Sequence, residues 1–109
     1  MISSKIAIII PTYNEKDNIG RLIKRVNDAC KNCNFGYKII VVDDNSPDGT
    51  ANAVDKLKTK FNITLIKRDK KLGLGSAYIE GFKRALRNKV NLILYFKWMP
   101  IYRIILDIF

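Results

Sequence analysis

The fold of this chain is decided by residues 39–50, which read IIVVDDNSPDGT. Four β-branched residues without polar alternation are typical of a strand buried on both faces, as in a parallel sheet. The carboxylates of Asp43 and Asp44 follow at its carboxyl end, where open α/β sheets bind their ligands. Ser46 and Pro47 then predict the N-cap and the first residue of a helix. We therefore expect a central strand that brings acids to a ligand site; the alternative is that these acids only cap and solubilise a loop.

The composition indicates one small globular domain. The chain has 109 residues, of which 48% are hydrophobic, which supports a core and excludes a disordered chain. Its net charge of +10 favours anionic partners such as nucleic acid, acidic lipid or phosphorylated small molecules, or reflects only a solvated basic surface. Cys30 and Cys33 form a single Cys-x-x-Cys pair in a chain without histidine, so we expect neither a zinc site nor a redox motif. Cys30 is expected to pack in the core.

The order of elements predicts an α/β fold. Residues 6–10 form a first strand ended by proline, and a helix follows with Asn14 as its N-cap. We expect further strands over 39–42, 63–66 and 92–96, a helix after Pro47 and a helix over 76–87. That last helix should place four residues near one face: Tyr78, Phe82, Ala85 and Leu86. Alternating strands and helices with short connections predict a mainly parallel sheet with right-handed crossovers.

Polar loops follow the first two strands and should meet at one edge of the sheet. Tyr13 offers a ring on which a base can stack, and Glu15 and Asp44 offer acceptors for a base N–H or ribose hydroxyls. Gly73 and Gly75 precede the third helix, but the loop lacks the third glycine of a dinucleotide fingerprint. We expect that loop to lie under the binding site.

Three ordered segments resemble the family 2 glycosyltransferases, which have the GT-A fold. They are residues 8–15 (IIIPTYNE), 41–50 (VVDDNSPDGT) and 72–77 (LGLGSA), and the SPDGT continuation favours the dolichol-phosphate mannosyltransferase branch. The resemblance implies the N-terminal half of a GT-A (Rossmann-like) domain, in the order β-α-β-α-β-α-β. Residues 1–96 would form this nucleotide-sugar-binding half, and residues 97–109 a divergent apolar tail.

The resemblance implies transfer of mannose from GDP-mannose to dolichol phosphate or another polyprenyl phosphate. The enzyme would be cytoplasmic, peripheral at the membrane face, with no nucleic-acid partner. Carried over by position, the nucleotide-sugar-binding residues are Pro11, Tyr13, Glu15, Val42 and Asp44. Family members would hold Mg²⁺ or Mn²⁺ through an Asp-x-Asp motif, and the ion would offset charge on the departing diphosphate.

The sequence departs from the family where that motif should follow the fourth strand. Residues 97–103 read KWMPIYR, so we expect no metal ligands and no catalytic residue in this chain, and impaired activity. Residues 98–100 (Trp-Met-Pro) must be encoded TGG-ATG-CCN, which reads Asp-Ala one base back, and suitable flanking codons give Met-Asp-Ala-Asp. We therefore hypothesise that the tail is a frameshift product. Its charges and proline argue against a spanning helix, which needs about 20 mainly apolar residues.

Two alternatives stay open. A polyprenyl-phosphate glycosyltransferase that uses a UDP-sugar would show the same segments, because donor and acceptor contacts largely lie in the other half of the domain. A non-catalytic nucleotide-binding module would instead use the basic surface to meet nucleic acid or lipid.

Overall fold

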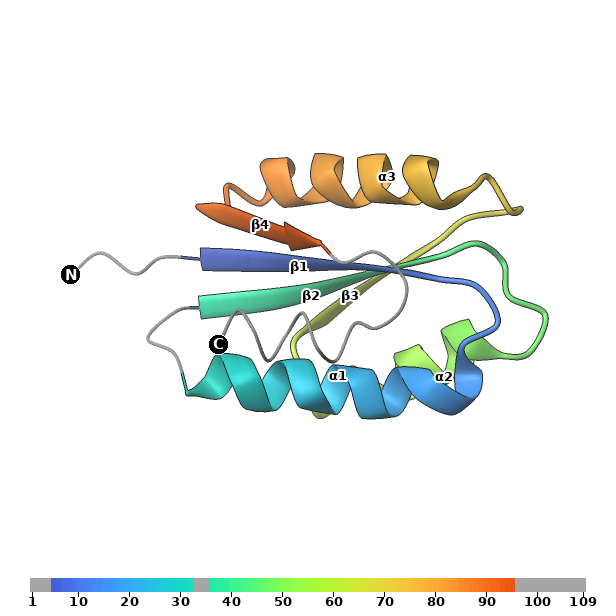
Figure 1. The fold of residues 1–109 in the computed structure, drawn as a ribbon, viewed down its shortest axis with the longest axis horizontal. Coiled ribbons are helices and arrows are strands. Elements are labelled where there is room, and N and C mark those ends of the chain that lie inside the picture. The colour runs from blue at the N-terminus through green and yellow to red at the C-terminus, as the bar shows by residue number, and fades with distance from the viewer. Residues whose placement is uncertain (1–4, 33–35, 96–109) are drawn as a thin grey trace.

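The computed structural model describes residues 5–32 and 36–95, which form a parallel sheet covered by helices on both faces (Figure 1). The elements are β1 (Lys5–Thr12), α1 (Lys16–Lys31), β2 (Gly36–Asp43), α2 (Thr50–Leu57), β3 (Ile63–Lys67), α3 (Leu74–Arg87) and β4 (Leu92–Tyr95). The strand order is β3-β2-β1-β4, and each neighbouring pair is parallel. Helices α1 and α2 cover one face and α3 covers the other (Figure 1). The predicted α/β class and order of elements are confirmed.

The core lies on both faces of the central strands β1 and β2. Their alternate side chains face opposite layers, as the pleat of a strand requires. Those that face α1 and α2 are Ile6, Ile8, Ile10, Ile39 and Val41. Those that face α3 are Ala7, Ile9, Ile40 and Val42. Burial on both faces explains why the two strands read as continuous apolar runs.

Helix α3 approaches the sheet through small residues. Its buried positions are Ala77, Gly81 and Ala85, and a Cβ added at Gly81 would lie 2.4 Å from Cγ2 of Ile9. Leu86 is 68% exposed, so its predicted place with the inward face is wrong. The axis of α3 lies too close to this face of the sheet for large side chains to fit between them.

The predicted helix start at Ser46 and Pro47 is also wrong. Helix α2 begins at Thr50, after Gly49 in the left-handed region at φ 89°. The Ser46 hydroxyl instead donates to Oδ1 of Asp43 over 2.6 Å and accepts from the backbone N–H of Asn14 over 2.9 Å. Ser46 therefore joins two loops at the edge of the sheet.

The start of α1 is capped by the loop that follows β2. Asn14 lies in the left-handed region at φ 56°, before the helix, so its predicted capping role is wrong. The backbone N–H of Glu15 donates to Oγ1 of Thr50 over 3.0 Å, and that of Lys16 donates to Oδ2 of Asp48 over 3.1 Å. Side chains distant in sequence thus satisfy N–H groups that a local cap would serve.

Cys30 is buried, as predicted, on the inner side of α1. Cys33 and residues 96–109 lie outside the described residues, as do the divergent tail and the place expected for the Asp-x-Asp motif. The division into residues 1–96 and 97–109 stays a prediction. Within 5–32 and 36–95, no helix has the length and apolar character needed to cross a membrane.

Candidate functional site

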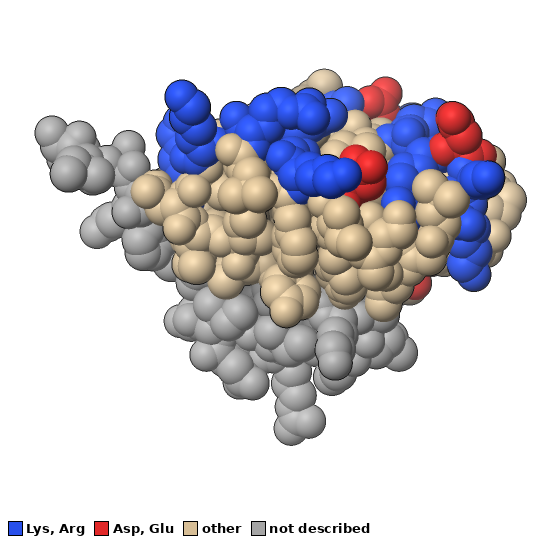
Figure 2. Space-filling view, turned by 90° about the horizontal axis from the view of Figure 1, so that it is seen from above, with Lys and Arg blue, Asp and Glu red and all other residues tan. Residues whose placement is uncertain are grey.

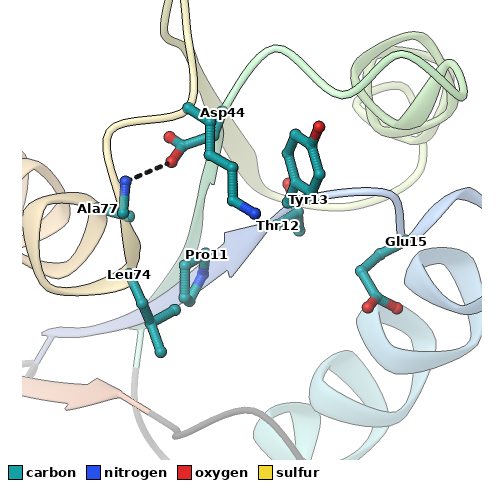
Figure 3. Close-up of a pocket in the computed structure, with 9 residues that line it drawn as sticks. Pro11, Thr12, Tyr13, Glu15, Asp44, Leu74 and Ala77 are labelled. Carbon is teal, nitrogen blue, oxygen red and sulfur yellow. Dashed lines mark hydrogen bonds between the residues drawn. The ribbon is translucent and has the colours of Figure 1, made fainter.

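A pocket of about 250 Å³ lies at the carboxyl ends of β1 and β2, beside the first turns of α3 (Figure 3). Its lining residues are Pro11, Thr12, Tyr13, Glu15, Asp44, Lys71, Gly73, Leu74 and Ala77. The structure thus brings together four of the five residues carried over by position. Val42, the fifth, is fully buried in the layer that packs against α3. That these residues bind a nucleotide stays a prediction.

Asp44 is buried at the back of the pocket and already accepts three hydrogen bonds. Its Oδ1 accepts from Nε of Arg68 over 2.6 Å, and both side chains are only 7% exposed. Its Oδ2 accepts from the backbone N–H groups of Leu72 and Gly73 over 3.2 and 3.3 Å. Asp44 therefore orders the loop that forms one wall of the pocket, and much of its acceptor capacity is already used.

Sequence reasoning missed Arg68, as it missed Lys71 in the lining of the pocket. Nη1 of Arg68 donates to Oγ of Ser76 over 2.6 Å, and its Nη2 donates to the carbonyl oxygen of Gly73 over 3.1 Å. The signal for it was available, because Arg68 follows β3 at the edge where Asp44 follows the neighbouring β2. A buried carboxylate needs a charged or hydrogen-bonding partner, and a cation after the adjacent parallel strand is well placed to supply it.

Asp43 has a structural role. It is buried, and its Oδ1 accepts a hydrogen bond from Oγ1 of Thr12 over 2.7 Å. Its Oδ2 accepts from the backbone N–H of Ser46 over 2.9 Å. The alternative that these acids only cap a loop therefore holds for Asp43. Asp44, in contrast, faces the pocket.

Tyr13 and Lys71 form the more exposed side of the pocket. Tyr13 is 36% exposed, and Nζ of Lys71 lies 4.4 Å from the centroid of its ring. Lys71 is the cationic residue among those that line the pocket. Glu15 accepts a hydrogen bond from Nδ2 of Asn18 over 3.2 Å. The pocket therefore combines an aromatic ring, two carboxylates and one ammonium group.

The described part of the chain does not supply a metal site. Within it, no group of three or more His, Cys, Asp or Glu side chains is close enough to hold a metal ion. Asp43 and Asp44 are turned toward protein donors by the hydrogen bonds given above. These residues therefore do not fit the Mg²⁺ or Mn²⁺ that the resemblance implies.

Residues 7–96 match the model of the family described as Glycosyl transferase family 2. The chain belongs to glycosyl transferase family 2. The resemblance seen in the three sequence segments is confirmed.

This family 2 chain is similar in sequence to two relatives that are named as mannosyltransferase or phosphomannose synthase. It is 46% identical over 81 residues to a dolichol-phosphate mannosyltransferase from Pyrococcus furiosus, a match that covers 74% of this chain and 22% of that protein. It is 40% identical over 88 residues to a polyprenol monophosphomannose synthase from Mycolicibacterium smegmatis, covering 79% of this chain and 32% of that protein. The chain thus spans about a fifth to a third of the length of these relatives.

Solved structures confirm the predicted GT-A fold. The mannosyltransferase PcManGT from Pyrobaculum calidifontis, in complex with GDP-Man and Mn²⁺, is 26% identical with a TM-score of 0.59, covering 78% of this chain and 25% of that one. Residues 1–349 of TarS from S. aureus, in complex with UDP-GlcNAc, are 25% identical with a TM-score of 0.65, covering 84% and 25%. The same fold therefore occurs in proteins that bind a GDP-sugar and a UDP-sugar.

Proposed function

We propose that this chain carries the nucleotide-binding part of an enzyme that transfers mannose from GDP-mannose to dolichol phosphate or another polyprenyl phosphate. The observation that carries the proposal is the convergence of Tyr13, Glu15 and Asp44 on one pocket of about 250 Å³. The identity of 46% to a dolichol-phosphate mannosyltransferase supports mannose as the sugar.

The size of the pocket favours a nucleoside as its occupant. Pockets that enclose a drug-sized ligand measure about 300–1,000 Å³, so a space of about 250 Å³ suits the base and ribose and leaves the diphosphate and sugar outside. Tyr13 would stack on the base. Glu15 and the remaining acceptor capacity of Asp44 would receive hydrogen bonds from the base or the ribose hydroxyls.

Transfer of mannose needs more than the described residues supply. In the proposed reaction, a phosphate oxygen of the lipid forms the bond to the anomeric carbon of mannose, and GDP departs. The described residues include no cluster that could hold a divalent ion beside that diphosphate. We therefore expect this chain alone to bind the nucleotide and to transfer mannose slowly or not at all.

An acidic membrane surface is the partner that the charge favours. Figure 2 shows the face on the α3 side, where lysine and arginine side chains gather along one border and uncharged side chains fill the middle. Ile79 and Leu86 of α3 are exposed, and Arg84 and Arg87 lie in its last turn. Exposed apolar side chains beside cations suit peripheral contact with anionic lipid, which supports a place at the cytoplasmic membrane face.

A UDP-sugar donor is the second candidate, favoured by the likeness to TarS in complex with UDP-GlcNAc. A non-catalytic module that meets nucleic acid is the third. Its binding would fall steeply with salt and would be indifferent to the base of the added nucleotide.

Calorimetry with GDP, UDP and GDP-mannose, each with and without Mn²⁺, tests the proposal. We expect GDP to bind more tightly than UDP, with little effect of the metal. Tyr13→Ala should weaken GDP binding by at least about ten-fold, because stacking of a base on an aromatic ring contributes about 1–3 kcal/mol. Leu86→Ala is the matched control, since it removes another exposed large side chain at the far end of α3.

The results separate the candidates. Tighter binding of UDP than of GDP would favour the second candidate, and no nucleotide binding would overturn the assignment of the pocket. Formation of mannosyl-phosphodolichol from GDP-mannose by the purified chain would show that the expected impairment is wrong.

A further inference from the structure

Lys71 occupies the ring face of Tyr13 inside the pocket. Its Nζ lies 4.4 Å from the ring centroid, and both residues line the cavity. Aromatic rings that stack have centroids about 4.5–7 Å apart. A base that stacks on this face of Tyr13 therefore needs the space in which the Lys71 ammonium lies.

The ammonium of Lys71 is the positive charge among the residues that line this pocket, and no carboxylate of the described residues forms an ion pair with it. The ion pairs of residues 5–32 and 36–95 are Lys31–Asp28, Lys58–Asp55 and Arg68–Asp44. Lys71 belongs to none of them, and Asp44 in the same pocket is already paired with Arg68. A cation held by a ring face is bound more weakly than one that donates hydrogen bonds to a phosphate. Lys71 is thus poised to change partner when an anionic ligand enters.

We propose that Lys71, on the more exposed side of the pocket, recognises the diphosphate that the pocket leaves outside. The Tyr13 ring holds its ammonium in place until the base arrives. The base then takes the ring face, and the displaced ammonium pairs with a phosphate oxygen. This inference rests on the proposed function, namely that the pocket receives a nucleotide, and it adds the residue that distinguishes a nucleotide from a nucleoside.

Calorimetry of guanosine and GDP with Lys71→Met and Lys70→Met tests the inference. Methionine keeps an unbranched side chain and removes the charge, and Lys70 is the exposed neighbour that does not line the pocket. Lys71→Met should weaken GDP binding by about ten-fold or more, as expected for a lost hydrogen bond between charged groups. It should leave guanosine binding unchanged or tighter, because the ring face becomes free. Lys70→Met should change neither ligand by more than about two-fold.

A second measurement follows the ammonium itself. The ε-methylene protons of Lys71 should show an upfield ring-current shift in the free protein, which is lost in Tyr13→Leu and relieved when GDP is added. Added salt should weaken GDP binding more in the wild-type chain than in Lys71→Met.

Equal losses of guanosine and GDP binding in Lys71→Met would show that Lys71 supports the base or the fold, and would overturn its assignment to the diphosphate. Tight GDP binding that Lys71→Met leaves unchanged would overturn this inference alone. Absence of GDP binding by the wild-type chain would overturn the proposed function and this inference with it.

Discussion

Replacing Arg68 with methionine should lower the free energy of unfolding of this domain more than any other single substitution in the pocket wall. The guanidinium is buried and donates to Asp44, to Ser76 and to the carbonyl of Gly73. Arg68→Met leaves the Asp44 carboxylate buried, with only the backbone N–H groups of Leu72 and Gly73 as donors.

The magnitude follows from the burial and the distance. Unit charges about 4 Å apart attract by about 4 kcal/mol at an effective dielectric constant of about 20. Removing one partner of a buried ion pair costs about 3–5 kcal/mol, because the other charge remains without compensation. We expect a loss in this range for Arg68→Met, since both side chains are only 7% exposed. Ser76→Ala removes one acceptor and should cost about 1 kcal/mol.

Urea unfolding followed by circular dichroism measures these losses, with Lys70→Met as the control for a nearby exposed cation. The double variant Arg68→Met with Asp44→Asn should be more stable than Arg68→Met alone by about 2 kcal/mol, because no buried charge is then left without a partner. A loss below about 1 kcal/mol for Arg68→Met, or a double variant as unstable as the sum of the single changes, would refute the buried pair. If Arg68→Met does not fold, the Ser76→Ala value and the double variant still test the reasoning.

Two further predictions concern packing and pH. Gly81→Ala should destabilise the fold by about 1–3 kcal/mol, because its Cβ would lie 2.4 Å from Cγ2 of Ile9. Gly75→Ala in the same helix is the control: a Cβ there has no atom within 4 Å, so the change should be neutral or stabilising by up to about 1 kcal/mol. Equal urea midpoints for the two variants would contradict the close contact at Gly81. Burial acts to raise the pKa of Asp48, but hydrogen bonds from Thr50 and from the backbone N–H of Lys16 outweigh it and hold the pKa below its ordinary value of 3.8. Because the pKa of Asp48 is lower in the folded chain than in the unfolded chain, the stability from Asp48 is present above about pH 4 and is lost as the pH falls through the folded pKa. Asp48→Asn should therefore flatten the decrease of the urea midpoint at acid pH. An unchanged decrease in that variant would contradict the role of Asp48.

The amino-acid sequence alone determined the order of the elements and the edge at which the pocket lies. Uninterrupted apolar runs can be buried on both faces only within a covered sheet, which indicated that β1 and β2 are central strands. Alternation with helices fixed the parallel direction, and the parallel direction brings the ends of β1 and β2 to one edge. The segments around Tyr13 and Asp44 also identified the family from their residues alone, because their motifs lie within short runs of sequence.

Only the tertiary structure decided what each polar side chain does. Asp43 and Asp44 are chemically equivalent in the sequence, yet one bonds to Thr12 and the other to Arg68, across 31 and 24 residues. The cap of α1 likewise comes from Thr50, which lies 35 residues from Glu15. Helix and strand patterns depend on residues a few positions apart, whereas hydrogen-bond partners depend on which loops the sheet register brings together. That register is a property of the folded chain, so the contacts of Arg68 and Lys71 became visible only there.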